Sequence, residues 1–285
     1  MKKQEITTKN SINHTKSIKN LDNLKKNDIN YKKSLGQNFI YDTNLLNAIV
    51  SDVDIHDDDV VLEIGAGAGT LTSILASRAS RVISFEIDRS LSEILNDVKN
   101  RHTNVEFYFQ DFMECDIDEL PFERAKVVAN IPYYITTPIV FKLIDKIEKF
   151  DMIMLLVQKE VAERFASSNG SKEYGITSVI LQSLFDVKIT RVVRKEAFTP
   201  MPKIDSAVVK MVPHKKYNIT NFDEFRAFIH QSFSMRRKTL VNNLKSKYDK
   251  EIILNSLKSL NLNENIRPEQ ISVKEYVLLF DMLKN

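Results

Sequence analysis

The chain has 285 residues, of which 43% are hydrophobic, and its 41 Lys and Arg slightly outnumber its 38 Asp and Glu, for a formal net charge of +3. This length suits one large or two modest domains, and no apolar run approaches the roughly 20 residues that a membrane-spanning helix needs. The single cysteine, Cys115, excludes an intramolecular disulfide framework and a cysteine-cluster metal site, and the five histidines form no ligand pattern.

Residues 1–30 are rich in Lys, Asn, Ser and Thr and show little apolar periodicity. This composition predicts a disordered basic tail. An amphipathic targeting helix is the alternative, but the stretch lacks Arg and carries acidic residues. It also lacks the charged-then-apolar pattern of a signal peptide, so we expect a cytoplasmic protein.

Apolar runs alternate with helical stretches from residue 31 to residue 213. The predicted strands are 60–64, 81–85, 105–109, 126–129, 151–157, 187–193 and 206–212. The predicted helices are 43–51, 71–79, 90–99, 136–147, 158–167 and 176–185. Such alternation is typical of an α/β, Rossmann-like domain with a parallel sheet and helices on both faces. Ligands bind such sheets at the carboxyl ends of the strands.

A glycine-rich turn follows the first predicted strand. Three of the six glycines in the chain fall between Gly65 and Gly69, where they permit a tight turn and close approach of the backbone to a ligand. Glu86 ends the next strand, 21 residues after Gly65. A carboxylate at about this offset accepts ribose hydroxyls in nucleotide-binding units. Thr70 stands where a dinucleotide site usually has its third glycine, which argues against NAD.

Asp111 follows the third predicted strand. At the end of a strand in this kind of sheet it is placed to accept a hydrogen bond from the amine of a cofactor adenine, with Phe112 beside the ring. The alternative role is that of a turn or helix cap, which is common for a lone Asp after a strand.

Residues Asn130 to Tyr134 read Asn-Ile-Pro-Tyr-Tyr and follow the fourth predicted strand. The side-chain oxygen of Asn130 and the carbonyl of Ile131 suit the two N–H groups of an aromatic amine, whose nitrogen is otherwise a poor nucleophile. Pro132 fixes the direction of the backbone, and Tyr133 offers a face on which a base stacks. The alternative is an ordinary strand end and proline turn with half-buried tyrosines.

The resemblance to a known family depends on four elements: the glycine-rich turn, Glu86, Asp111 and the block from Asn130 to Tyr134. In this order they resemble those of S-adenosylmethionine-dependent RNA adenine N6-methyltransferases. More narrowly, the chain is similar to the ribosomal RNA small-subunit adenine N6,N6-dimethyltransferases. The narrower resemblance depends on Lys32–Ile40, Tyr134–Ile139, Phe198–Val208, Phe233–Leu240 and Arg267–Glu269, and it spans the chain from about Tyr31 onward.

The resemblance implies a class I methyltransferase sheet and a set of site residues. The implied cofactor-binding residues are Asn38, Ile40, Gly65, Glu86, Asp111 and Asn130. The implied catalytic residues are Asn130, Ile131, Pro132, Tyr133 and Phe198, with Phe198 as a second stacking face opposite Tyr133. The cofactor is S-adenosyl-L-methionine as methyl donor, and no metal is expected. Because an adenine inside a duplex cannot present N6, the target is single-stranded or flipped out.

Residues 214–285 show no strand pattern. Phe222, Phe225, Phe228, Ile229 and Phe233 recur at helical spacing, which predicts a core stripe. We therefore expect three parts: a tail at 1–30, a catalytic domain at 31–213, and a small all-helical RNA-binding domain at 214–285.

Charge is distributed unevenly among these parts. Residues 1–33 have a net charge of +6, residues 34–213 of −8 and residues 214–285 of +5. Lys and Arg supply much of the salt-dependent affinity for phosphates, so two basic ends suit RNA binding, although solvated surface is the alternative. Arg236, Arg237 and Lys238 are the sharpest RNA-binding candidates, since three adjacent cations repel one another unless an anion is near.

The function implied by the resemblance is dimethylation of N6 of two adjacent adenines near the 3′ end of small-subunit (16S) ribosomal RNA. The implied partners are this RNA and a pre-30S-type particle, with a role in ribosome biogenesis, and we expect a monomer. A non-catalytic assembly factor and a large-subunit resistance methyltransferase are the alternatives.

Overall fold

The computed structural model describes residues 30–235 and 237–284. The predicted tail lies outside this part of the chain, apart from residue 30. The chain divides into two compact units. Unit 1 consists of the described residues up to Phe122, Ala129–Leu143 and Arg194–Lys203. Unit 2 consists of Glu123–Val128, Ile144–Val193 and the described residues from Ile204 onward. The predicted domain boundary at residue 213 falls inside unit 2, and the predicted division into a catalytic and an RNA-binding domain stays a prediction.

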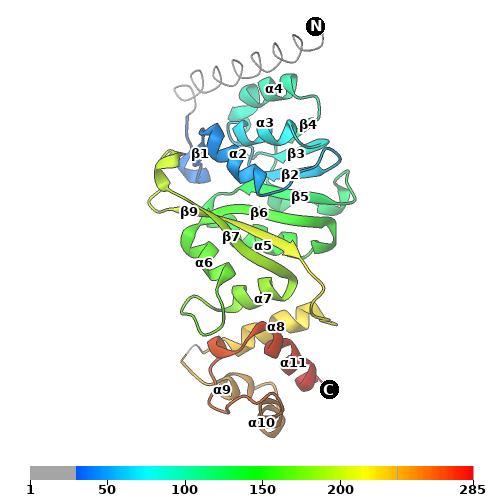
Figure 1. The fold of residues 1–285 in the computed structure, drawn as a ribbon, viewed down its shortest axis with the longest axis vertical. Helices are drawn as coiled ribbons and strands as arrows, with labels where there is room; N and C mark the ends of the chain where they lie inside the picture. Colours follow the sequence, from blue (N-terminus) through cyan, green and yellow to red (C-terminus); the bar gives the residue numbers. More distant parts are fainter. Residues whose placement is uncertain (1–29, 236, 285) are drawn as a thin grey trace, which may run out of the picture. The chain divides into compact units, whose positions relative to one another are not determined.

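Seven strands form one sheet in the order β4-β3-β2-β5-β6-β9-β7 (Figure 1). In unit 1, β2 (Val60–Ile64), β3 (Arg81–Phe85) and β4 (Val105–Tyr108) pair in parallel. Val61, Leu62, Val82 and Ile83 have no exposed surface, as expected for apolar runs in a sheet covered by helices. The Rossmann-like α/β class predicted from the sequence is confirmed.

The helices of unit 1 follow the strands as the sequence predicts. They are α2 (Thr43–Ser51), α3 (Thr70–Ala76), α4 (Ser92–Arg101) and α5 (Thr136–Ile144, whose last residue belongs to unit 2). Helix α2 begins at Asp42, whose carboxylate accepts from the N–H groups of Asn44 and Leu45. Helices α3 and α4 pack on β3 and β4 (Figure 1). Short 3₁₀ turns fill several connections: Lys33–Leu35, Arg89–Leu91, Phe112–Glu114, Ile117–Glu119, Tyr133–Ile135 and Lys195–Ala197.

Unit 1 also contains a small second sheet that the sequence did not predict. Strands β1 (Phe39–Ile40) and β8 (Phe198–Thr199) pair antiparallel, with Ile40 opposite Phe198. Two residues are too few to show the alternation that identifies a strand. This pairing joins segments that lie about 160 positions apart in the sequence, Phe39–Ile40 and Phe198–Thr199.

The prediction of a parallel sheet is wrong for three strands of unit 2. Strands β6 (Phe150–Gln158), β7 (Phe185–Val193) and β9 (Ser206–Pro213) pair antiparallel in the order β6-β9-β7, with a register shift between Ile189 and Arg191. A parallel pair needs a long crossover, usually a helix, whereas neighbouring antiparallel strands need only a loop. No α-helix lies between β7 and β9 in the structure, and this explains why the two strands pair antiparallel.

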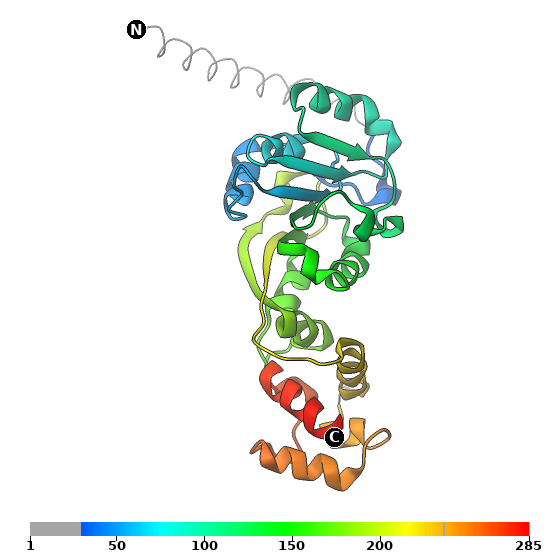
Figure 2. The same cartoon turned by 90° about the vertical axis from the view of Figure 1, so that its right-hand side faces the viewer.

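Unit 2 ends in helices. After α6 (Lys159–Ala166) and α7 (Ile176–Leu184), the chain beyond β9 forms α8 (Phe222–Ser232), α9 (Leu240–Leu244), α10 (Lys250–Ser259) and α11 (Val273–Lys284), with 3₁₀ turns at Ile147–Lys149 and Pro268–Gln270. Figure 2 shows these last helices in gold to red, without strands among the described residues. The predicted stripe is part of the core: Phe225 and Phe228 are buried and their ring centroids lie 5.5 Å from that of Phe280.

Within the described part of the chain, the helices are all too short or too polar to cross a membrane.

Candidate active site

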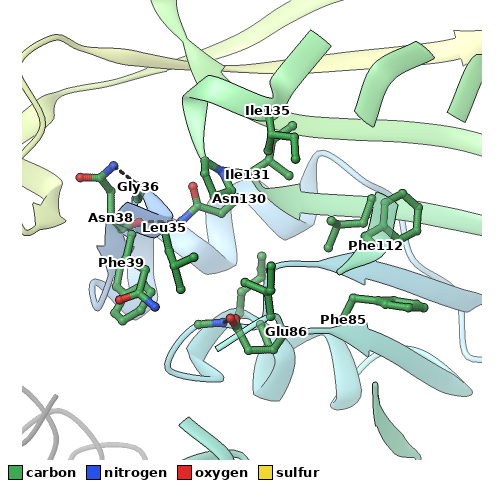
Figure 3. Close-up of a pocket in the computed structure, with 18 of the residues that line it drawn as sticks. Leu35, Gly36, Asn38, Phe39, Phe85, Glu86, Phe112, Asn130, Ile131 and Ile135 are labelled. Atoms are coloured by element: carbon green, nitrogen blue, oxygen red, sulfur yellow. Dashed lines mark hydrogen bonds between the residues drawn. The ribbon is translucent and has the colours of Figure 1, made fainter. Parts of the chain in front are cut away.

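A cavity in unit 1 opens where β2, β3 and β4 and the last residues of β5 (Ala125–Asn130) end (Figure 3). Its wall comes mainly from the segment at the end of the first 3₁₀ turn and after it, the glycine-rich loop, the ends of β3 and β4, and the block after β5, with Leu46 of α2. Nine of the predicted site residues lie on this wall: Asn38, Ile40, Gly65, Glu86, Asp111, Asn130, Ile131, Pro132 and Tyr133. All six predicted cofactor-binding residues therefore surround one space.

The glycine-rich loop can follow its path only with glycine. Gly65, Gly67 and Gly69 all have positive φ angles, of 86°, 55° and 74°. A Cβ atom on Gly67 would lie 2.9 Å from the Phe39 ring, and one on Gly69 would lie 2.7 Å from the Val98 side chain. Side chains at these two positions would collide with Phe39 and Val98, so glycine is what allows the loop to take this tight path.

Glu86 carries its carboxylate into the cavity wall from the end of β3, and the residue is only 6% exposed. One oxygen accepts from the N–H of Gly67 at 2.8 Å, and the other accepts from the N–H of Asp88 at 2.8 Å. Burial raises the pKa of Glu86, and the backbone donors only partly offset this. Each carboxylate oxygen has further lone pairs, so the group fits the predicted acceptor for a pair of ribose hydroxyls.

Asp111 caps a turn, which is one of the two roles that the sequence left open, and its role toward a cofactor adenine stays a prediction. Its side chain accepts from the N–H of Met113 at 2.8 Å and so caps the turn after β4, while the residue also lines the cavity. Beside it, Phe112 is buried and packs edge-on against Phe85, with ring centroids 5.2 Å apart. Two aromatic rings next to a carboxylate suit a flat heterocycle with an amine.

Lys142 of α5 fixes this turn, a contact that was not predicted from the sequence. Its ammonium donates to the carbonyls of Met113 at 2.8 Å and Cys115 at 2.5 Å, and lies 5.6 Å from the centre of the Phe112 ring. Burial raises the pKa of the Cys115 thiol, an effect that the nearby Lys142 opposes. The thiol is therefore a poor nucleophile, as its acidic sequence neighbours also indicate.

The amide of Asn130 is held in one orientation. Its Nδ2 donates to the carbonyl of Asn38 at 3.0 Å, and Nδ2 of Asn38 donates to the carbonyl of Gly36 at 3.0 Å (Figure 3). Because the nitrogen of the Asn130 amide donates in this way, its oxygen is the amide atom that can serve as an acceptor. The predicted role of this oxygen, to accept a hydrogen bond from the target amine, stays a prediction.

The two tyrosines after Pro132 differ in exposure. Tyr133 is half-buried on the cavity wall, whereas Tyr134 is 63% exposed. A Cβ atom on Gly36 would lie 3.2 Å from Pro132 and 3.3 Å from the Tyr134 ring. The block after β5 therefore packs tightly on the segment that precedes β1. The sequence did not single out Tyr134 as a site residue.

Phe198 stands apart from the other predicted catalytic residues. It lies on β8, opposite Ile40, and is only 3% exposed. It is not among the residues that line the cavity. Its role as a second stacking face stays a prediction.

The predicted RNA-binding triplet lies in unit 2. Arg237 and Lys238 are exposed in the turn before α9, and Arg236 is outside the described residues. In the described chain there is no group of three or more His, Cys, Asp or Glu arranged to hold a metal ion. The expectations of RNA binding at this triplet and of metal-free chemistry both stay predictions.

The cluster of Asp88, Lys32 and Gln37 near the cavity was not predicted from the sequence. Asp88 follows β3 and is contacted by Lys32 and Gln37, which lie 56 and 51 positions earlier in the chain. A contact across such a distance leaves no periodic signal in the sequence. The only hint was a second acidic residue two positions after Glu86.

Comparison with known proteins gives consistent matches over most of the chain. The model of the family described as "Ribosomal RNA adenine dimethylase" matches residues 28–285. Proteins named ribosomal RNA small subunit methyltransferase A are 40% identical in Bacillus pumilus (strain SAFR-032), over 92% of this chain and 94% of the relative, and 40% identical in Ligilactobacillus salivarius (strain UCC118), over 90% of each.

Two solved structures are similar along nearly their whole lengths. A dimethyladenosine transferase from Plasmodium falciparum aligns with a TM-score of 0.72 at 30% identity, over 83% of this chain and 94% of the other. The 23S rRNA methyltransferase ErmE aligns with a TM-score of 0.73 at 25% identity, over 87% of this chain and 100% of the other.

Proposed function

The chain belongs to the ribosomal RNA adenine dimethylase family, and we propose that it dimethylates N6 of two adjacent adenines near the 3′ end of 16S ribosomal RNA. S-adenosyl-L-methionine is the methyl donor. The choice of the small subunit is supported by relatives that are 40% identical and carry a small-subunit name. The observation that carries the proposal is the Asn130 amide, held by Asn38 with its oxygen available on a wall that also contains Glu86 and the glycine-rich loop.

The described residues fit this cofactor. Gly67 has no room for a side chain, which leaves backbone at the cavity surface, and Glu86 offers a buried carboxylate already oriented by two N–H groups. Glu86 would hold the ribose hydroxyls, Asp111 the adenine amine, and Asn38 and Gly65 the rest of the molecule. When bound, the cofactor supplies a methyl group on a positively charged sulfur, which is its own leaving group.

The chain's own contribution is alignment. The Asn130 oxygen and the Ile131 carbonyl accept the two N–H groups of the target adenine, so that the nitrogen lone pair is less delocalised into the ring. Tyr133 stacks on the flipped base. The bound cofactor would supply the methyl group to N6 and would leave as S-adenosylhomocysteine, and the proton lost from nitrogen would pass to water. A second cycle on the monomethylated amine gives the dimethyl product. Alignment of this kind contributes about 7–11 kcal/mol toward lowering a barrier.

The proposal includes a place of action. Ribosomal RNA of a pre-30S-type particle in the cytoplasm is the proposed partner, the protein acts as a monomer, and no metal takes part. Basic residues such as Arg237 and Lys238 would contact RNA phosphates.

The test uses purified protein, labelled S-adenosylmethionine and small ribosomal subunits that lack the modification, with large subunits in parallel. We expect N6,N6-dimethyladenosine in digested small-subunit RNA only. Label in large-subunit RNA would instead support action on 23S rRNA, the substrate given in the name of ErmE. Tight binding to subunits with no label in either RNA would support a non-catalytic assembly factor.

A further inference from the structure

The segment from Lys32 to Asn38 runs along the cavity and is fixed at two points. Leu35, Gly36, Gln37 and Asn38 line the cavity, yet the segment contains only one short 3₁₀ turn, Lys33–Leu35. Its internal hydrogen bonds, such as those from the N–H groups of Leu35 and Gly36 to the carbonyls of Lys32 and Lys33, are local and do not fix it against the rest of unit 1. Gly36 packs on Pro132 and Tyr134, and polar contacts join Lys32 and Gln37 to Asp88 and Asn38 to Asn130.

The first point of attachment is a buried carboxylate. The side chain of Asp88 has no exposed surface. One oxygen accepts from the Lys32 ammonium at 2.5 Å, and the other accepts from the Gln37 amide at 2.7 Å. The N–H of Lys32 also donates to the side chain of Gln37 at 2.8 Å, which closes a ring of contacts. Ser90 adds a hydroxyl at 2.6 Å and an N–H at 3.0 Å.

These donors keep Asp88 ionised. Burial alone would raise the pKa of Asp88, but the contacts with Lys32, Ser90 and Gln37 outweigh it and lower the pKa to about 2. The charge is therefore present throughout the physiological range. A buried ion pair is weak support for stability, because desolvation offsets most of the attraction. Holding a segment in one position is a role that this contact suits better.

The second point of attachment is the catalytic amide. Asn38 offers its carbonyl to Nδ2 of Asn130 at 3.0 Å. If the segment shifted, Asn130 would lose this acceptor, and its amide would be free to turn. The oxygen that faces the target amine would then no longer be fixed.

The first attachment is also continuous with the predicted ribose site. The backbone N–H of Asp88 donates to Glu86 at 2.8 Å, and the other oxygen of Glu86 binds the N–H of Gly67 at 2.8 Å. One chain of contacts thus leads from the glycine-rich loop through Glu86 and Asp88 to the segment, and from the segment to Asn130.

We propose that Asp88 is a positioning residue for methyl transfer, acting through Lys32 and Gln37 on the segment that orients the Asn130 amide. The proposal rests on the function proposed above, in which the Asn130 oxygen accepts an amine proton. Asp88 touches neither the cofactor nor the target base. It fixes the position of Asn130, which contacts both in the proposed reaction.

Substitution of Asp88 by Asn gives a specific pattern. Asp88→Asn keeps the size of the side chain and the backbone N–H that binds Glu86, but removes the charge that holds Lys32. We expect kcat to fall about 100-fold, as for a displacement of about 1 Å at a catalytic group. The Kd for S-adenosylhomocysteine should rise much less than kcat falls, because Glu86 and the glycine-rich loop are untouched and Asn38 is the one proposed cofactor contact that lies in the displaced segment.

A matched control removes another ion pair of unit 1. Arg81 and Glu106 pair at 2.6 Å between β3 and β4, and neither lines the cavity. Glu106→Gln should leave kcat within about twofold of wild type. Lys32→Arg, which keeps the charge, should retain most of the activity, whereas Lys32→Met should resemble Asp88→Asn. The double variant Asp88→Asn/Lys32→Met should be no worse than either single one, because both act through the same contact.

A second readout does not depend on methylation. Hydrogen exchange of the backbone amides of residues 33–38, followed by mass spectrometry, should be about 10-fold faster in Asp88→Asn than in wild type or Glu106→Gln. Unchanged exchange would overturn the proposal, even where kcat falls. Faster exchange with unchanged kcat would overturn it too, since the segment would then not orient the catalytic amide. A wild type that labels no RNA would instead count against the proposed function, and the exchange rates would still decide whether Asp88 holds the segment.

Discussion

The cavity wall of unit 1 and the helical core of unit 2 bury different chemistry. In unit 1, Glu86 lines the cavity and Glu63 and Asp88 lie next to residues that do; all three are buried carboxylates with hydrogen-bond donors. In the helices after residue 213, the buried groups are mainly rings and aliphatic side chains, with Phe228 and Tyr276 at the centre. Burying a carboxylate costs solvation free energy, but its hydrogen bonds hold the group in a fixed position. Burying an aromatic ring stabilises the fold through the apolar area that is removed from water. Changes in the first region should therefore affect function, and changes in the second should affect stability.

The largest expected effect is in the helical core. Phe228→Ala should lower the free energy of unfolding by about 3–5 kcal/mol, because it leaves a cavity among Tyr248, Tyr276 and Phe280. Denaturant unfolding measures this loss, and calorimetry should show unchanged affinity for S-adenosylhomocysteine. The half-buried Phe222 is the matched control, and Phe222→Ala should cost clearly less. Weaker cofactor binding in folded Phe228→Ala would break the division between the two regions.

Asn130→Ala should show the opposite pattern. Loss of the oriented amide should reduce methyl transfer by about 100–1,000-fold, the effect of removing one group that stabilises a transition state. Filter binding should show RNA affinity close to that of wild type, and the melting temperature should change little because Asn130 is half-buried. An equal loss of RNA binding and of transfer would contradict the assigned role.

Glu63 provides a test of how the carboxylates of the first region affect stability. It is fully buried; one oxygen accepts from Thr72 and Ser84 at 2.6 Å each, and the other has no partner. Burial raises the pKa of Glu63 from 4.5 to about 7. Between these values the folded state keeps a proton that the unfolded state has lost, so the free energy of unfolding falls as the pH rises.

The size of this fall is on the order of 3 kcal/mol. Glu63→Gln should remove this pH dependence. The unfolding free energy of the variant should therefore rise relative to that of wild type between pH 4.5 and pH 7. Denaturant unfolding across this range measures the slope, which is independent of any constant cost of the substitution. Parallel curves for the two proteins would contradict the raised pKa.

Glu86→Gln should have the smallest effect of the four, and it should be confined to the cofactor. Loss of the charge should weaken binding of S-adenosylmethionine by about 10–100-fold, the range for hydrogen bonds to a charged group. Calorimetry checks this. Glu114, exposed in the turn after Asp111, is the control, and Glu114→Gln should bind the cofactor like wild type. Unchanged affinity in Glu86→Gln would remove Glu86 from the site.

The sequence predicted what depends on local pattern. Strands β2 and β3 were predicted to the residue, because Val60–Ile64 and Arg81–Phe85 are apolar runs bounded by polar turns. The predicted site residues Glu86, Asp111 and Asn130 also line one cavity, because the ends of neighbouring strands meet at one edge of a sheet.

What the sequence could not predict depends on partners far along the chain. The antiparallel pairing of β6 with β9, in which Gln158 lies opposite Ser206, joins strands that are not neighbours in the sequence, and strand composition does not encode it. The contact between Lys32 and Asp88 joins residues 56 positions apart. Phe198 carries the residue type that a stacking role needs, but its burial opposite Ile40 is a property of the fold.

The central claim is that the cavity of unit 1 binds the methyl donor beside Asn130. A crystal structure of the protein with S-adenosylhomocysteine tests it most directly. We expect the ribose hydroxyls at hydrogen-bond distance, about 2.5–3.0 Å, from the Glu86 carboxylate. The sulfur should lie next to Asn130, and the adenine should lie between Asp111 and Phe112. A ligand bound elsewhere, or one that leaves Glu86 and Asn130 without contact, would contradict the account.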